Sequence, residues 1–174
     1  MLVEWTYLEQ TAPPDFVSVP EQRAPVLTLR LDPSPDLARR LYRDVGAPHG
    51  WSSRLGWGLD DWSVALGKSE FWIAGSPTRP RGFCELTAEA SEVTIKLLGL
   101  LPPFRGKGLG SLMVRESVRN AWSVHRRSAE VPKVARVLVG TTSRDSPRAL
   151  ELHRRNGFQV IRTDLHRATA ARST

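Results

Sequence analysis

Residues 93–141 read as a strand, a helix and a second strand, and this order limits the possible folds more than any other feature of the chain. Residues 93–100 and 134–141 are apolar runs of strand length, and a long helix with a broad apolar face is predicted between them. Two strands joined through one helix pair in parallel, with a right-handed crossover. The sequence therefore predicts an α/β fold whose sheet is at least partly parallel.

Short apolar runs elsewhere predict the other strands, at residues 2–9, 26–31, 71–74, 82–87 and 158–161. Residues 71–74, 82–87 and 93–100 follow one another closely, so they are expected to form an antiparallel meander. The sheet is therefore predicted to be mixed.

Three helices are expected besides the one in the crossover. Residues 34–45 begin with Ser-Pro, which suits an N-cap and first turn. Residues 146–157 also begin with Ser-Pro and end at a glycine placed as a left-handed C-cap. Asp60 is expected to cap a short helix through Leu66.

The positive charge of the chain is concentrated in its second half. Residues 1–100 hold 10 Lys/Arg against 13 Asp/Glu, whereas residues 101–174 hold 15 against 5. This asymmetry favours an anionic partner on the second half: nucleic acid, anionic lipid or a phosphate-bearing cofactor. The alternative is an arginine-rich composition without any nucleic-acid partner. Nucleic acid ranks lowest, because no helix-turn-helix, zinc or RNP-like motif is recognisable.

Composition excludes several classes of protein. The single cysteine, Cys84, rules out an internal disulfide framework and a multi-cysteine zinc site, and it is expected to be a buried structural residue. No apolar run approaches the roughly 18 residues of a membrane span, and the first ten residues lack the pattern of a signal peptide. We therefore expect a cytoplasmic chain that folds as one domain over residues 1–174, without a membrane partner or a metal.

The segment RGKGLGS at residues 105–111 is the strongest candidate for a binding loop. It holds three glycines and two cations without an acid, between a predicted strand and a predicted helix. Glycines let backbone N–H groups converge on an anion, and the helix N-terminus adds partial positive charge. A P-loop would need Ser or Thr in place of Gly108, and the dinucleotide fingerprint would need glycine in place of Ser111.

The spacing that fits is R-x-x-G-x-G, from Arg105 to Gly110. It resembles the coenzyme A pyrophosphate loop of the GNAT superfamily of N-acetyltransferases. Residues 97–102 (LLGLLP) resemble the GNAT strand beside the acetyl-pantetheine arm. Residues 146–158 (S-x-x-A-L-x-L-H-x-x-x-G-F) resemble the second GNAT signature, N-x-x-A-x-x-L-Y-x-x-x-G-F. Residues 41–57 are more loosely similar to a bacterial GNAT subgroup of unassigned substrate.

This resemblance implies a GNAT fold: a mixed sheet splayed around a βαβ cofactor-binding core, with helices on both faces. It implies acceptor-side strands and helices over residues 1–68, an acyl-CoA-binding core over 69–162 and a loose tail over 163–174. The polar tail offers little for the family's final strand, which leaves an edge that a second subunit of a homodimer can fill.

The resemblance also implies acetyl-CoA as the acyl donor. The residues expected to bind it are Leu98, Leu100, Arg105, Gly106, Lys107, Gly108, Leu109, Gly110, Ser111, Ser146, Ala149 and Leu152. Ser146 stands where the family has asparagine, so one hydrogen bond to the cofactor differs.

Two residues are candidates for proton transfer. His153 occupies the position of the family's tyrosine general acid, and a histidine with a pKa of about 6.5 can protonate a leaving thiolate at neutral pH. Glu85 lies on the strand before the cofactor strand, a region from which GNAT enzymes take a base, and Glu92 is the alternative. Surface roles remain the alternative for each.

Aromatic residues between positions 42 and 62 are expected to form the acceptor wall of a GNAT fold. Tyr42, Trp51, Arg54 and Trp57 can bind an apolar or cationic acceptor, or pack the helices, whereas Trp62 is expected to pack. The sequence thus predicts an acetyl-CoA-dependent N-acetyltransferase that acts on a primary amine of a small molecule or protein. The alternative is a noncatalytic acyl-CoA-binding GNAT module, which would suit the departures at Ser146 and His153.

Overall fold

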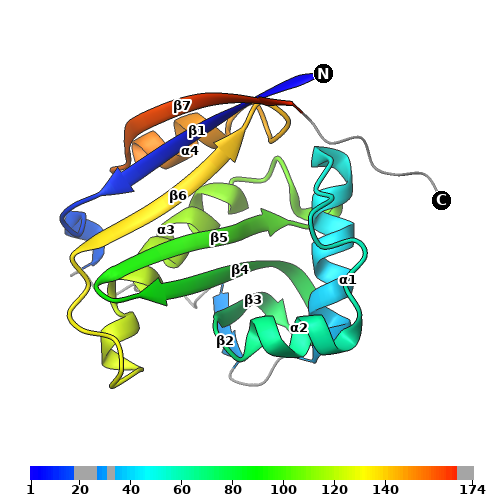
Figure 1. Ribbon diagram of the computed structural model, residues 1–174, viewed down its shortest axis with the longest axis horizontal. Coiled ribbons are helices and arrows are strands. Elements are labelled where there is room, and N and C mark those ends of the chain that lie inside the picture. Colours follow the sequence, from blue (N-terminus) through cyan, green and yellow to red (C-terminus); the bar gives the residue numbers. More distant parts are fainter. Residues whose placement is uncertain (18–26, 31–33, 168–174) are drawn as a thin grey trace.

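A seven-stranded sheet in the order β2-β3-β4-β5-β6-β1-β7 forms the framework of the molecule (Figure 1). The computed structural model describes residues 1–17, 27–30 and 34–167. Its strands are β1 (Leu2–Gln10), β2 (Leu27–Arg30), β3 (Glu70–Ser76), β4 (Arg79–Glu89), β5 (Glu92–Leu100), β6 (Arg136–Thr142) and β7 (Gln159–Arg167). β5 and β6 pair in parallel, and the other five neighbouring pairs are antiparallel. The mixed α/β sheet, its meander and its crossover are confirmed.

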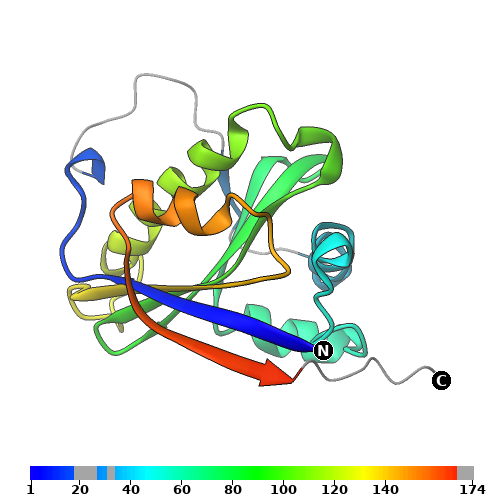
Figure 2. The ribbon, with the colours of Figure 1, turned by 90° about the horizontal axis from the view of Figure 1, so that it is seen from above.

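Helices cover both faces of the sheet (Figure 2), as predicted. They are α1 (Pro35–Gly46), α2 (Leu59–Leu66), α3 (Leu109–Trp122) and α4 (Ala149–Arg155). α1 and α2 pack on one face in a core cluster that includes Phe71 and Phe83. α3 packs on the other face, where Val114 and Val118 join a cluster that contains Val137. The sheet is therefore buried on both sides near β4 and β5.

The predicted helix starts are confirmed at one position and corrected at two. The Ser34 hydroxyl accepts the Leu37 N–H at 3.5 Å and caps α1. α2 begins after Gly58, whose N–H donates to the Asp61 carboxylate at 2.9 Å, so the expectation that Asp60 caps this helix was wrong. α4 begins at Ala149 rather than Ser146, because a turn closed by the Ala149 N–H and the Ser146 carbonyl occupies the preceding residues.

The C-terminal segment differs from the prediction of a loose tail from residue 163. β7 continues to Arg167 and pairs along the length of β1, from Leu2 opposite Arg167 to Glu9 opposite Gln159. A strand held by backbone hydrogen bonds tolerates polar side chains on its open face. β7 thus supplies the final strand that was expected to be missing or shortened, and it occupies the position expected to stay open for a second subunit. Residues 168–174 of the expected tail, and Val26 and Leu31 of the expected strand, lie outside the described residues.

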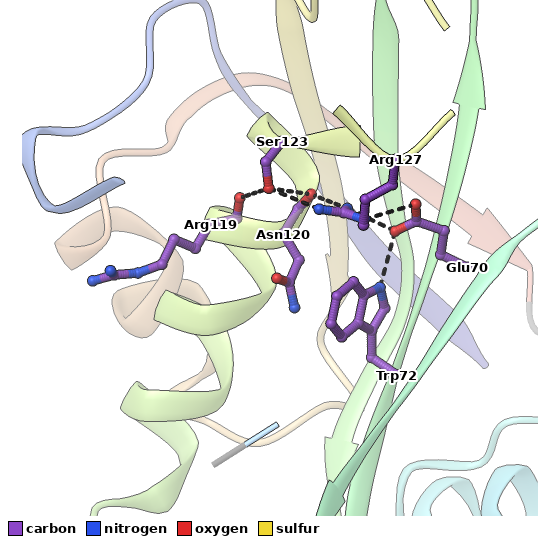
Figure 3. Close-up of polar contacts among 6 residues, drawn as sticks. All are labelled: Glu70, Trp72, Arg119, Asn120, Ser123 and Arg127. Atoms are coloured by element: carbon purple, nitrogen blue, oxygen red, sulfur yellow. Dashed lines mark hydrogen bonds and ion pairs between the residues drawn. The ribbon is translucent and has the colours of Figure 1, made fainter. Parts of the chain in front are cut away.

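A network of hydrogen bonds around Arg127 joins the end of α3 to the start of β3 (Figure 3). The Arg127 guanidinium donates to both carboxylate oxygens of Glu70, at 2.7 and 3.0 Å, and to the carbonyl of Asn120 at 2.6 Å. Glu70 also accepts the indole N–H of Trp72 at 3.0 Å. Arg127 therefore supplies a donor to the end of α3 and a partner to a half-buried carboxylate.

We expect Arg127→Ala to lower the free energy of unfolding by about 1–3 kcal/mol, because Glu70 and the α3 carbonyl lose their charged donor. Urea denaturation measures this change. Arg126→Ala is the matched control, since Arg126 is exposed and its expected change is within about 0.5 kcal/mol. Equal effects of the two substitutions would contradict a stabilising role of the hydrogen-bond network around Arg127.

Candidate active site

The parallel strands β5 and β6 separate halfway along their length. They pair from Glu92 opposite Arg136 to Ile95 opposite Val139, and no later residues of β5 pair with β6. A register shift in the pairing with β4 leaves Lys96 as the extra residue of a bulge at this point. Figure 1 shows the two strands diverging. The edge of residues 97–100 that faces β6 is therefore not paired with any strand in the described ranges, and its backbone can bond a ligand.

A cavity of about 590 Å³ occupies this gap. Most of the predicted site residues line it: Tyr42, Trp51, Leu98, Leu100, Arg105, Gly106, Gly108, Gly110, Ser111, Ser146, Ala149, Leu152 and His153. Five predicted site residues lie outside its lining: Arg54, Trp57, Glu85, Lys107 and Leu109. The structure thus brings the expected cofactor loop, cofactor strand and α4 around one space.

The glycine-rich loop has the backbone conformation of an anion site. Gly106 and Gly108 have φ of +72° and +77°, and a Cβ on either would meet no atom within 4 Å. These glycines are therefore required by the backbone turn rather than by crowding. Gly108 directly precedes α3, so the free N–H groups of that helix open toward the loop.

Arg105 braces the loop. Its side chain donates to the Leu100 carbonyl at the end of β5 and to the Val45 carbonyl in α1, both at 2.9 Å. Burial lowers the pKa of the guanidinium. Arg105 therefore fixes the loop against both elements, in addition to lining the cavity.

His153 lies against the cavity as a neutral ring. It is 6% exposed, packs edge-on against Phe158, and its Nδ1 has no hydrogen-bond partner among the described residues. Burial lowers its pKa to about 4, although Asp145 acts in the opposite direction. The expectation of a pKa near the ordinary value was therefore wrong, since desolvation disfavours the imidazolium. At neutral pH the ring can donate or accept a hydrogen bond without carrying charge.

Glu85 is paired with Arg54, one of the residues expected to form the acceptor wall. Arg54 Nη1 lies 2.8 Å from Glu85 Oε2, and Glu85 is 1% exposed. The Arg54 guanidinium also lies over the rings of Trp57 and Trp62, at 4.7 and 5.3 Å from their centroids. Trp62 is fully buried, which confirms its predicted packing role. The alternative acid, Glu92, bonds Arg136 at the paired end of β5.

Similarity to known proteins matches this geometry. The family described as acetyltransferase (GNAT) domain matches residues 67–160 of the chain. The chain belongs to the GNAT acetyltransferase family. No curated protein matches it.

Solved GNAT structures share the fold. A GCN5-related N-acetyltransferase from Sphaerobacter thermophilus is 18% identical, with a TM-score of 0.62 over 93% of this chain and 50% of that one. A putative GNAT acetyltransferase from Novosphingobium aromaticivorans is 13% identical, with a TM-score of 0.63 over 95% and 63%. A GNAT acetyltransferase from Streptococcus pneumoniae is 18% identical, with a TM-score of 0.54 over 76% and 86%. This GNAT chain thus spans about half to two thirds of the first two structures.

Sequence reasoning missed a set of hydrogen bonds that joins two remote segments at the GNAT cavity. Asp145 accepts the Thr142 N–H at 2.7 Å and the Trp51 indole N–H at 3.4 Å. His49 Nδ1 lies 3.2 Å from the Arg144 carbonyl. The loop after β6 is therefore tied to the segment between α1 and α2. Asp145 carries only the signal of a turn residue, and its partner Trp51 is remote in sequence.

Two further features concern membranes and metals. None of the helices in the described ranges is long and apolar enough to cross a membrane. Within the same ranges, His, Cys, Asp and Glu side chains do not gather in groups of three or more that could hold a metal.

Cys84 is buried, and its burial raises the pKa of the thiol to about 12, so it is unsuited to act as a nucleophile.

Proposed function

We propose that this GNAT protein transfers the acetyl group of acetyl-CoA directly to a primary amine of a small molecule or a protein. The observation that carries the proposal is the cavity between the diverging strands β5 and β6, with the glycine-rich loop and the start of α3 at its border. An elongated ligand with a phosphate end and an amide-containing arm matches these two features. Coenzyme A is such a ligand.

The residues that would hold acetyl-CoA follow from their positions. The N–H groups from Gly106 to Ser111 and the α3 N-terminus suit the pyrophosphate. The unpaired edge between Leu98 and Leu100 can bond the amides of the pantetheine arm as an added strand would. Lys107, exposed on the same loop, adds positive charge for the phosphates.

Acetyl transfer needs a group near the leaving sulfur. The thioester supplies an activated acetyl group when bound; a C–N bond forms, the C–S bond breaks, the amine loses a proton and the thiolate gains one. A neutral His153 can hydrogen-bond the sulfur as charge develops there. Glu85 can take the amine proton only through water or after Arg54 moves, because the ion pair occupies it and it does not line the cavity.

Tyr42 and Trp51 remain our proposed acceptor contacts. Both line the cavity, and their rings lie 5.5 Å apart between centroids. The Tyr42 hydroxyl accepts the Arg54 N–H and contacts the Ser53 hydroxyl, both at 3.2 Å. These contacts hold the wall on which an amine would rest. Arg54 and Trp57 would then support that wall from behind.

Gly108→Asp tests the phosphate site against Gly108→Asn. The two side chains have the same shape and suffer the same strain at positive φ, but only aspartate places a negative charge beside the phosphates. We expect acetyl-CoA affinity, measured by calorimetric titration, to be about tenfold weaker in the aspartate variant than in the asparagine variant. Equal affinities would argue against phosphate binding at this loop.

Release of the coenzyme A thiol over a panel of amines tests catalysis. Thiol release that depends on both acetyl-CoA and an amine supports the transferase. Tight binding of acetyl-CoA without release for any amine would favour the noncatalytic acyl-CoA-binding module instead.

A further inference from the structure

Four cationic side chains of the described residues line the cavity outside the glycine-rich loop: Lys96, Arg144, Arg148 and Arg167. Lys96 is exposed at the bulge where β5 leaves β6. Arg144 lies in the loop after β6 and packs over the backbone of Gly50. Neither Lys96 nor Arg144 forms an ion pair with any residue of the described ranges. The positive charges of these two side chains are therefore available to a ligand.

The acidic side chain found in the cavity lining of the described residues already has hydrogen-bond partners. Asp145 is the one acidic residue among the described residues that line the cavity. Its Oδ2 accepts the Thr142 N–H at 2.7 Å and the Thr141 hydroxyl at 3.1 Å, and its Oδ1 accepts the Trp51 indole N–H at 3.4 Å. The acid is thus used to fix its own loop. The cavity keeps a positive potential beyond the phosphate site.

Two aromatic side chains, Trp5 and Tyr7, lie beside the same part of the cavity. The rings of Trp5 and Tyr7 lie over Gly140, 4.0 and 3.9 Å from the position of a Cβ on that glycine. Trp5 is 38% exposed, lines the cavity and meets His166 edge-on at 6.2 Å between centroids. Trp5 and Gly140 belong to the half of the sheet formed by β6, β1 and β7. A planar or apolar group can lie against Trp5 there.

Trp5 and Gly50 lie on the side of the sheet away from the phosphate loop. Val137 and Val139 of β6 face α3 in its core cluster, so Gly140, the next residue of the strand, faces the opposite side. That side carries α1 and its connection to α2, and the glycine-rich loop leads into α3 on the other side (Figure 2). Trp5 and Arg144 therefore face the part of the cavity that is left for an acceptor.

We propose that the acceptor is a small primary amine that also carries an anionic group, a carboxylate or a phosphate, on an apolar body. Lys96 and Arg144 hold the anionic group, and Trp5 contacts the body. The proposal rests on the proposed acetyl transfer and names its substrate class. A positive surrounding also favours the neutral, attacking form of the amine, which suits a site whose buried acid Glu85 is paired with Arg54.

Matched amine pairs test the class. The pairs are L-phenylalanine against L-phenylalaninamide and phosphoethanolamine against ethanolamine, each assayed by thiol release at saturating acetyl-CoA. We expect kcat/KM to favour the anionic member of at least one pair by about tenfold or more. The pair that shows the preference distinguishes carboxylate from phosphate. Equal or greater kcat/KM for the neutral members of both pairs would overturn the proposal.

Charge variants locate the anion site. Lys96→Gln and Arg144→Gln are expected to raise KM for the anionic amine about tenfold while leaving KM for its neutral analogue and the affinity for acetyl-CoA unchanged. Lys68→Gln and Arg126→Gln remove the same charge from exposed positions outside the cavity lining and serve as controls. Equal losses for both members of a pair would contradict an anion contact.

A binding measurement separates this proposal from the proposed transfer. Calorimetric titration of the protein–coenzyme A complex with L-phenylalanine and phosphoethanolamine reports acceptor binding without turnover. If Arg144→Gln weakens binding of these probes and the wild-type protein releases no thiol, the proposed acetyl transfer is contradicted and the anion site is supported. Absence of binding by both probes would overturn the anion site itself.

Discussion

Arg54→Met is expected to lower the free energy of unfolding by about 3–5 kcal/mol, as loss of one partner of a buried ion pair does. Glu85 is 1% exposed and depends on Arg54 Nη1, 2.8 Å away, for its charged donor. The substitution leaves the Glu85 carboxylate buried without its charged partner. It also removes the guanidinium that lies over Trp57 and Trp62. Urea denaturation at neutral pH measures the loss.

The double variant Arg54→Met/Glu85→Leu is the control. Replacing both charges by apolar groups of similar size removes the unpaired carboxylate, so most of the lost stability should return. A double variant no more stable than Arg54→Met would contradict the ion pair as the cause. The same protein also tests catalysis: retained thiol release assigns Glu85 to support of the wall, whereas a folded variant with normal acetyl-CoA affinity and no release assigns it the proton.

The sequence predicted the parts of the fold whose signals are local. Ser34 and Pro35 marked the start of α1, and the glycines of the loop before α3 required a turn that only glycine readily adopts. The position of Glu85 on its strand was predicted, but its pairing with Arg54 was not, because Arg54 lies 31 residues away in a segment without a regular pattern. Ion pairs between remote segments leave no pattern in a single sequence.

The pairing of β1 with β7 at the edge of the sheet could not be predicted from the sequence for the same reason. β1 and β7 lie at opposite ends of the chain, and their pairing brings Trp5 and His166 together at the cavity. The polar residues after Thr163 carry little strand signal, because their side chains are largely exposed and the strand is held by backbone bonds to β1. The pairing of two chain ends is a long-range event, so the sequence predicted the glycine-rich loop and α4 better than the part of the cavity lined by Trp5.

The pKa of His153 depends on the burial of its ring, which the position of the residue in the sequence does not determine. The spacing placed it correctly on the cavity side of α4, four residues after Ala149, where a basic run made an exposed ring the alternative. The fold packs the ring against Phe158 and lowers its pKa to about 4. The unfolded chain has the ordinary pKa of about 6.5. Between these values acid protonates only the unfolded chain, so stability is lost as pH falls through this window.

We therefore expect the wild-type protein to lose about 3 kcal/mol of unfolding free energy relative to His153→Leu between pH 7 and pH 4. Leucine fills a similar volume and cannot titrate, and every other ionisable group is common to both proteins, so their difference isolates the imidazole. Urea denaturation at half-unit steps of pH measures it. A difference that stays constant from pH 7 to pH 4 would mean that the folded ring titrates at its ordinary value. His153 could then protonate the leaving thiolate as an imidazolium at neutral pH, and the neutral hydrogen-bond donor proposed here would be wrong.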